Sequence, residues 1–414
     1  MTLLEIGKTA KEAARKTALL PTDCKNQILL AMADALEREA DRILAANAQD
    51  VAASEAKGTA PHMLDRLRLT QARIAGMASG MRQVAALPDP VGELMGGGTR
   101  PNGLQISKRR VPMGVVGVIY EARPNVTADT AALCLKAGNA CILRGGSEAI
   151  GSNKAIVAAM CAAAKEAGLP DGAIQLMEDT SRETAAGLMK LNGYVDVLIP
   201  RGGAGLIQTV VKTATVPVIE TGTGNCHIYV DKCCDTDMAV NIVINAKTQR
   251  PSVCNAAESL LIHADAPQEA YARLDKALHD AGVEIRACGR CLAKLPSAVP
   301  ASEEDYGTEF LGLVISAKMV DSVQEAIAHI NRYGTGHSEC IVTNDYAAAE
   351  EFLNGVDAAA VYVNASTRFT DGEEFGLGAE IGISTQKLHA RGPMGLKELT
   401  TYQYIVRGSG QIRR

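Results

Sequence analysis

The stretch that decides the fold is residues 112–125, which read PMGVVGVIYEARPN. Its centre, residues 115–120, is an unbroken apolar run. A strand with one face in water would alternate apolar and polar residues, so this run predicts a strand buried on both faces of a parallel sheet. The turn after it, residues 121–125, then lies at a strand's carboxyl end, where open α/β sheets bind their ligands.

Similar runs after this stretch extend the pattern. After it come strand-like segments at 140–143, 174–177, 195–199 and 216–219. Helix-like segments between them end at Gly138 and Gly168, and glycine is a common C-terminal stop. The alternation predicts a doubly wound α/β sheet of the nucleotide-binding kind. A second α/β block is expected beyond Glu220, with strands at 228–230, 259–262, 313–315, 341–342 and 360–363.

The two ends of the chain have different patterns of apolar and polar residues. The first hundred residues predict amphipathic helices, because apolar residues recur by threes and fours from Ile28 to Ile43 and again after Thr70. A loop is expected where prolines and Gly96-Gly97-Gly98 break this pattern. Residues 104–111 and the alternating tail around Tyr402 predict strands that pair with each other or with a partner chain.

Composition limits the class of protein. At 414 residues, with 47% hydrophobic and 21% charged, the chain should form a globular protein of two or three domains. A net charge of −5 argues against nucleic-acid binding, and no apolar run is long enough to span a membrane. Eleven cysteines without framework spacing suit a reducing, cytoplasmic compartment. The single C-x-x-C, residues 288–291, lacks a second ligand pair, so no metal is expected.

Residues 245–258, NAKTQRPSVCNAAE, hold the candidate nucleophile, Cys254. A reactive cysteine acts as its thiolate, which nearby Lys247 and Arg250 would favour, and Asn255 could donate to an oxyanion. The alternative is an inert buried thiol, the more common state of a free cysteine. The local sequence alone favours the inert thiol.

Two glycine turns follow predicted strands and are candidate phosphate sites. They are residues 144–148, RGGSE, and residues 200–205, PRGGAG, which open a helix. Glycine lets backbone N–H groups approach a pyrophosphate, and arginine can pair with phosphate oxygens. Neither has G-x-G-x-x-G spacing, so each is equally consistent with a simple tight turn.

Two long stretches carry a resemblance to a known family. Residues 320–341, VDSVQEAIAHINRYGTGHSECI, and residues 389–396, HARGPMGL, resemble the aldehyde dehydrogenase superfamily, and within it a branch that reduces an acyl phosphate. The likeness covers about residues 23–402. It implies an aldehyde-dehydrogenase-like α/β fold with a Rossmann-type doubly wound cofactor domain, an α/β catalytic domain and a small β extension for oligomerisation. The implied boundaries are 1–104 and 123–222 for NADP(H) binding, 223–385 for catalysis, 105–122 and 400–414 for oligomerisation, and 386–399 for a return to the cofactor domain.

The resemblance also implies roles for individual residues. It makes Cys254 the nucleophile and Asn125 the side-chain half of an oxyanion hole. The positions implied to bind cofactor are Arg144, Gly145, Ser147, Gly202, Gly203 and Glu309. Arg144 replaces a lysine usual in the superfamily, and a guanidinium there would suit the 2′-phosphate of NADPH.

The implied activity is NADPH-dependent reduction of L-glutamyl 5-phosphate to L-glutamate 5-semialdehyde and phosphate through a Cys254 thioester, a step of proline biosynthesis. Glu220 stands where hydrolytic aldehyde dehydrogenases keep the carboxylate that activates water. It is either turned away here or handles protons. The alternative function is therefore an NAD(P)-dependent aldehyde dehydrogenase that releases a free acid.

Several basic side chains are candidates for substrate contacts, and the resemblance implies partners. Lys247, Arg250 and His337 are candidates to hold the charged groups of the substrate, and each could equally be solvated or bonded to the scaffold. His227, His263 and His389 are expected to be structural, since none has metal-ligand spacing. The resemblance implies a homodimer or higher homo-oligomer and a functional coupling to glutamate 5-kinase, which would supply the substrate.

Overall fold

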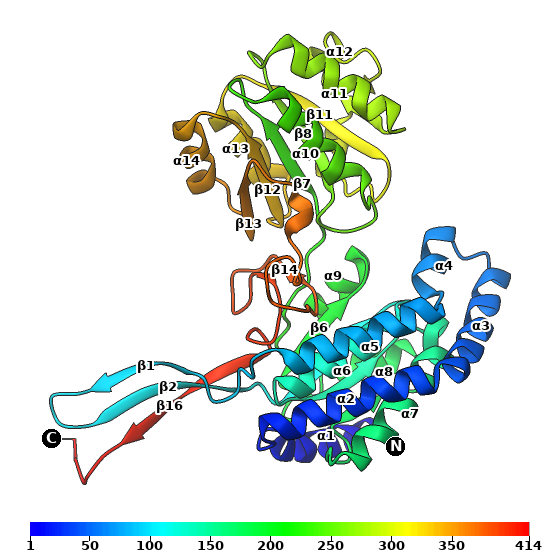
Figure 1. The fold of residues 1–414 in the computed structure, drawn as a ribbon, viewed down its shortest axis with the longest axis vertical. Coiled ribbons are helices and arrows are strands. Elements are labelled where there is room, and N and C mark those ends of the chain that lie inside the picture. Colours follow the sequence, from blue (N-terminus) through cyan, green and yellow to red (C-terminus); the bar gives the residue numbers. More distant parts are fainter. Residues whose placement is uncertain (414) are drawn as a thin grey trace. The chain divides into compact units, whose positions relative to one another are not determined.

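The computed structural model describes residues 1–413, apart from the side chains of residues 61 and 62, and divides into two compact units. Unit 1 consists of Met1–Thr221, Gly376–Gly382 and the chain from Met394 onward. Unit 2 consists of Gly222–Phe375 and Ile383–Pro393. Figure 1 shows the helices and strands of each unit.

The core of unit 1 is a parallel sheet with the strand order β5-β4-β3-β6. Its strands are β3 (Val115–Tyr120), β4 (Ala140–Arg144), β5 (Ile174–Leu176) and β6 (Val197–Arg201). Every residue of β3 is buried, as its apolar sequence predicts. The predicted strand at 216–219 is wrong, because only a single bridge joins Val218 to Leu198. Pro217 within that run has no N–H to donate to a ladder.

Helices cover this sheet. They are α1 (Leu3–Thr17), α2 (Thr22–Arg38), α3 (Ala40–Ala56), α4 (Pro61–Leu67), α5 (Gln71–Ala86), α6 (Pro124–Lys136), α7 (Ile150–Glu166), α8 (Arg182–Met189) and α9 (Ala204–Thr213). The periodic apolar residues of α2 are fully buried; they are Ile28, Leu29, Met32, Ala33 and Leu36. Thr70, the predicted start, is the N-cap of α5, and its hydroxyl accepts a hydrogen bond from the Arg73 N–H at 3.2 Å.

An antiparallel arm projects from the helices of unit 1 (Figure 1). Its strands, in the order β1-β2-β16, are β1 (Leu94–Thr99), β2 (Gln105–Pro112) and β16 (Thr400–Arg407). The expected pairing of the basic segment with the tail is therefore confirmed. The expected loop at residues 96–98 is wrong, because these glycines lie in β1. At Gly97 a Cβ atom would lie 2.5 Å from the Ile106 carbonyl oxygen, so this close approach requires glycine.

The arm also corrects one implied boundary. Residues 105–122 do not belong to one sheet. Strand β2 is part of the arm, whereas β3 pairs with β4 and β6 inside the unit 1 sheet. The bend between them is at Gly114, whose φ is 123°. A positive φ of this size is accessible to glycine and disfavoured for other residues.

Unit 2 contains a parallel sheet with the order β10-β9-β11-β8-β7-β12-β13. Its strands are β7 (Cys226–Val230), β8 (Ala257–His263), β9 (Glu284–Ala287), β10 (Val299–Pro300), β11 (Val314–Val320), β12 (Ser338–Val342) and β13 (Ala360–Val363). The helices are α10 (Thr236–Thr248), α11 (Gln268–Asp280), α12 (Gly289–Leu292), α13 (Val323–Tyr333) and α14 (Tyr346–Gly355), with 3₁₀ turns at Ser147–Ala149 in unit 1 and at Glu303–Gly307 and Thr367–Phe369 here.

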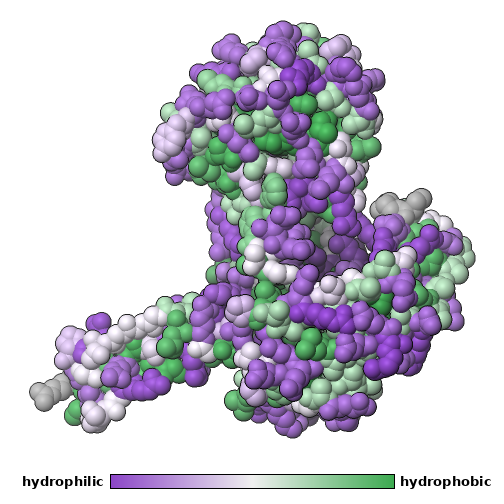
Figure 2. Space-filling model, viewed as in Figure 1, coloured by the Kyte–Doolittle hydropathy of each residue, from purple (hydrophilic) through white to green (hydrophobic). Residues whose placement is uncertain are grey.

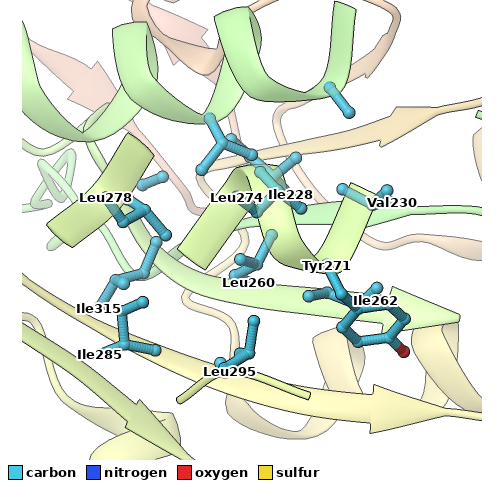
Figure 3. Packing of buried hydrophobic residues seen from close by; sticks show 14 of the residues in the cluster. Ile228, Val230, Leu260, Ile262, Tyr271, Leu274, Leu278, Ile285, Leu295 and Ile315 are labelled. Atoms are coloured by element: carbon cyan, nitrogen blue, oxygen red, sulfur yellow. The ribbon is translucent and has the colours of Figure 1, made fainter. Parts of the chain in front are cut away.

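One face of this sheet packs against α10 and α11. Figure 3 shows Ile228, Leu260 and Ile315 from neighbouring strands meeting Leu274 and Leu278 of α11. All five are almost completely buried, which is the arrangement expected where strands are apolar on both faces.

The segment expected to return to the cofactor domain, residues 386–399, is divided between the units. Residues up to Pro393 stay in unit 2, where β14 (Ile383–Ser384) pairs with β15 (Gly392–Pro393). Lys387 and Arg391 both form ion pairs with Asp357 of the same unit. These contacts explain why the chain rejoins unit 1 only at Met394.

Residues 1–413 contain no helix that is long and apolar enough to cross a membrane. In the same range, no group of three His, Cys, Asp or Glu side chains is placed to hold a metal ion. The eleven cysteines all lie in this range, and none of them forms a disulfide.

Candidate active site

Cys254 lies on the loop between α10 and β8, at the amino end of β8. A buried ion pair joins the two ends of this loop, because Lys247 in the last turn of α10 contacts Glu258 in β8. Both side chains are fully buried, and Glu258 also accepts a hydrogen bond from the Leu311 N–H at 3.1 Å. The ion pair therefore holds together the two ends of the loop that carries the thiol.

Lys247 was a candidate substrate contact, and the structure contradicts that assignment. Its ammonium is used by Glu258 and has no exposed surface. Burial lowers the pKa of Lys247 and raises the pKa of Glu258 to about 7. The Lys247 side chain holds the loop in place through its ion pair with Glu258 and is not available to a bound molecule.

Residues 224–226 pack closely against the backbone of Cys254. A Cβ atom on Gly224 would lie 1.5 Å from the Cys254 carbonyl oxygen, so only glycine fits. The Cys226 thiol donates to the same oxygen with a sulfur–oxygen distance of 3.2 Å. The Gly224 N–H donates to Glu309 at 2.7 Å, which fixes that carboxylate beside the same loop.

We predict that Gly224→Ala lowers kcat by about 100-fold or more, because a displacement of about 1 Å at a reacting atom has an effect of this size. Unit 1 should bind cofactor as before. Gly289→Ala is the matched control, since a Cβ there meets nothing within 4 Å. Steady-state kinetics of both variants check this. A wild-type kcat in Gly224→Ala would contradict the proposed role of Gly224 in positioning Cys254.

His337 contacts the sulfur directly. Its Nε2 lies 3.2 Å from the Cys254 Sγ, and its Nδ1 lies 2.8 Å from the Ser338 hydroxyl. The imidazole is fully buried, and burial lowers its pKa to about 4, so the ring is neutral at pH 7. The sequence suggested His337 as a substrate contact, whereas the structure places it against the nucleophile.

Asn255 does not act as the oxyanion donor that the sequence suggested. Its amide donates to the Thr370 carbonyl at 2.9 Å and to the Arg368 carbonyl at 3.3 Å, and its own oxygen accepts from the Arg368 guanidinium. With both ends of the amide used, Asn255 braces the loop.

Arg368 is a site residue that the sequence did not reveal. Its half-buried guanidinium also donates to Gln249 at 3.0 Å. Burial and the neighbouring Arg250 lower the pKa of Arg368, while Cys254 raises it. Arg368 therefore places positive charge near the Cys254 thiol, and positive charge favours a thiolate. Arg250 itself is exposed.

The predicted cofactor residues of unit 1 lie at the carboxyl ends of its strands. Arg144 ends β4, and its guanidinium donates to the backbone carbonyls of Thr180 and, at 3.1 Å, Ser181. Gly145 follows it, and a Cβ there would lie 2.2 Å from the Asn153 amide. Ser147 beyond this turn is exposed.

The turn after β6 already holds an anionic group. Gly203 is the N-cap of α9, and its N–H donates to the Glu121 carboxylate at 3.0 Å. Gly202 lies so close to Glu121 that a Cβ would meet the carboxyl carbon at 2.6 Å. A helix N-terminus attracts anions, so the carboxylate stands where the oxygen of a pyrophosphate would fit.

The remaining candidates divide between the units. Asn125 is exposed in the first turn of α6, where its amide donates to Asp129 at 3.1 Å. Glu220 is half-buried, next to the last residue of this part of unit 1. Glu309 belongs to unit 2. Within unit 2 the structure brings His337 to Cys254, and Glu309 to Gly224.

Comparisons with known proteins identify the family of the chain. The model of the aldehyde dehydrogenase family matches residues 3–285 and 296–404. Gamma-glutamyl phosphate reductases from Moorella thermoacetica and Heliobacterium modesticaldum are 62% and 61% identical, covering 99% and 98% of this chain and 98% of each relative. The crystal structure of gamma-glutamyl phosphate reductase from Thermotoga maritima matches with a TM-score of 0.97 and 48% identity over 100% of both chains. The chain belongs to the aldehyde dehydrogenase family.

Proposed function

We propose that the protein catalyses NADPH-dependent reduction of L-glutamyl 5-phosphate to L-glutamate 5-semialdehyde and phosphate, a step of proline biosynthesis. The observation that carries the proposal is the Cys254 thiol, 3.2 Å from a neutral buried imidazole, in a chain 62% identical to a protein named gamma-glutamyl phosphate reductase. A thiol with an adjacent base is the arrangement that acyl transfer requires.

The chemistry begins at Cys254. Its thiolate attacks the C5 carbonyl of the acyl phosphate, the C–S bond forms, and the C–O bond to phosphate breaks. Negative charge develops on the carbonyl oxygen, and we assign Asn125 and the Cys254 N–H to stabilise it. Arg250 and Arg368 supply positive charge that suits a phosphoryl group.

The nicotinamide cofactor, when bound, supplies hydride to the resulting thioester. We assign Gly202 and Gly203 to its pyrophosphate, because the α9 N-terminus already donates a hydrogen bond to a carboxylate. Arg144, Gly145 and Ser147 are assigned to the adenosine side, and Glu309 to the nicotinamide ribose. These residues would hold the cofactor, and Cys254 would carry the acyl group as a thioester.

The preference for NADPH over NADH is assigned to Arg144. We predict that Arg144→Ala raises KM for NADPH by about 10- to 100-fold and changes KM for NADH little, because a charge-assisted hydrogen bond to the 2′-phosphate is lost. Initial rates with the two cofactors measure this, with the exposed Lys190→Ala in unit 1 as control. An equal rise for both cofactors would contradict the assignment.

The reaction is most easily tested in reverse. Semialdehyde and NADP⁺ should yield NADPH only when phosphate or arsenate is present, because that anion must release the acyl group from Cys254. Turnover without either anion would contradict the proposal and favour the hydrolytic alternative, in which Glu220 activates water to give the free acid.

We also propose that copies of the chain associate through the arm. Its strands expose large apolar side chains, including Leu94, Met95, Tyr402, Tyr404 and Val406. Figure 2 shows apolar residues among polar ones along this arm. Edge strands with exposed apolar residues are suited to pairing with another chain. A homodimer or higher homo-oligomer is the expected assembly.

The cellular setting follows from the chemistry of the chain and its substrate. Free cysteines suit a reducing compartment, so we place the protein in the cytoplasm. An acyl phosphate must be made by a kinase that phosphorylates a carboxylate. We therefore propose a functional coupling to glutamate 5-kinase.

A further inference from the structure

We propose that His337 accepts the proton of the Cys254 thiol and delivers it to the departing phosphate, and that Ser338 and Cys226 hold the imidazole in the tautomer this requires. The inference rests on the proposed function, because it names the proton acceptor for the same acylation step. His337 is a catalytic residue in this scheme, since its Nε2 lies 3.2 Å from the reacting sulfur. Ser338 and Cys226 are positioning residues.

Contacts of Cys226 decide which nitrogen carries the proton. The Cys226 S–H donates to the Cys254 carbonyl oxygen at 3.2 Å, so its sulfur can only accept from its other neighbour. That neighbour is the His337 Nδ1, at 3.7 Å. We therefore assign the proton to Nδ1, from which the Ser338 oxygen at 2.8 Å also accepts in this tautomer. The Nε2 lone pair is left facing the Cys254 thiol.

A chain of hydroxyl groups continues from Ser338. The Ser338 and Thr370 oxygens are 2.6 Å apart, and the Tyr362 hydroxyl lies 2.7 Å from Thr370. If Nδ1 donates to Ser338, each hydroxyl in turn donates to the next, and the Tyr362 hydroxyl, on a half-buried residue, ends the chain. Directional chains of this kind fix both the orientation and the tautomer of a buried imidazole.

The surroundings of His337 keep it neutral and able to accept. Burial is the cause of its lowered pKa, about 4, so the ring is unprotonated at physiological pH and its Nε2 lone pair is available. The same burial disfavours the imidazolium, so the ring holds the added proton only until phosphate departs. Titratable groups lie close to it on β7 and on the loop before β8, and a third is linked to it from β13 through the hydroxyl groups; they are Cys226, Cys254 and Tyr362. Glu339 of β12 accepts hydrogen bonds from His227 instead. Beyond them, Arg368 interacts electrostatically with both thiols.

The proton balance of acylation then closes within the site. The thiol proton moves to Nε2, the sulfur electron pair forms the C–S bond, and the electrons of the breaking C–O bond leave with phosphate. Phosphate leaving without a proton would be a trianion. The proton on Nε2 passes to the departing oxygen, which yields hydrogen phosphate and restores the neutral imidazole.

The test separates this role from the overall activity by following the thiol alone. Cys254 alkylation by iodoacetamide is measured from pH 5 to 10 without substrate, in the full-length protein and in His337→Asn. The asparagine amide can replace Nδ1 but offers nothing at Nε2. We expect alkylation at pH 7 to fall about tenfold or more in the variant, with its midpoint moving toward the ordinary thiol pKa of about 8.5.

Turnover provides the second readout. His337→Asn should lower the first-turnover release of phosphate by about 10²- to 10⁴-fold with NADPH affinity unchanged. The control is His279→Asn on an exposed position of α11, which should behave as the parent protein. If His337→Asn releases phosphate at the parent rate, the inference is overturned while the proposed function stands.

A second pair of variants decides the matter if His337→Asn does not fold. Ser338→Ala removes the acceptor at Nδ1 and should raise the pH midpoint of alkylation and slow phosphate release by about tenfold, whereas Ser338→Thr keeps the hydroxyl and should restore both. Equal behaviour of Ser338→Ala and Ser338→Thr would overturn the inference. If the parent protein shows the His337-dependent alkylation profile but does not reduce the acyl phosphate, the proposed function alone fails.

Discussion

Replacing Cys254 by serine is expected to lower turnover by about 10⁴-fold or more while NADPH binding stays at the parent level. A hydroxyl is a far weaker nucleophile than a thiolate near pH 7, and the lost step is the formation of the covalent intermediate. The residues assigned to the adenosine and pyrophosphate of the cofactor lie in unit 1, which does not contain Cys254.

Steady-state rates and NADPH titration of Cys254→Ser check this expectation. Cys233→Ser is the matched control, because Cys233 is an exposed thiol in the same unit. Its turnover should equal that of the parent protein. Substantial activity in Cys254→Ser, or its loss in Cys233→Ser, would place the nucleophile elsewhere.

Replacing Lys247 by methionine is expected to destabilise the protein by about 3–5 kcal/mol, the usual result of leaving one partner of a buried ion pair unpaired. Glu258 would keep its Leu311 contact and lose its cation. The double variant Lys247→Met with Glu258→Gln removes both charges and should recover much of the loss. Denaturant unfolding of the three proteins measures this, and additive losses in the double variant would contradict it.

The stability that the single variant Lys247→Met loses should depend on pH. The pKa of Glu258 in the folded protein, about 7, is above its unfolded value of about 4.3. The folded state therefore favours the protonated carboxyl, and stability falls as pH rises through this interval. Without Lys247, which lowers that pKa, the interval extends further upward. Lys247→Met should accordingly lose more stability at pH 8 than at pH 5 in thermal unfolding.

Much of the fold was predictable because burial on both faces leaves a plain trace in sequence. The runs that became β3 and β4 are apolar throughout, and both are central strands of unit 1. Strand β9 (Glu284–Ala287) was not predicted, since Glu284 and Arg286 interrupt it with charges that pair with each other at 2.7 Å. The arm's β1 was missed for the opposite reason, because its glycines resemble a loop while serving a close strand approach.

The site was predictable in its parts and not in its contacts. Cys254 stood out through the family resemblance, whereas its pairing with His337 depends on β7, β8 and β12 being neighbours in one sheet. Lys247 and Arg250 looked alike in sequence, yet one is buried in an ion pair and the other is exposed. Arg368 gave no sequence signal, because its role comes from a 3₁₀ turn that folds back onto Asn255.

The central claim is that Cys254 carries the acyl group between the acyl phosphate and hydride. The most direct measurement is the intact mass of the protein after mixing with L-glutamyl 5-phosphate in the absence of NADPH, followed by peptide mapping. We predict an increase of one glutamyl group on the peptide containing Cys254, which disappears when NADPH is added. An unmodified protein that nevertheless releases semialdehyde with NADPH, or a glutamyl group on another residue, would contradict the account.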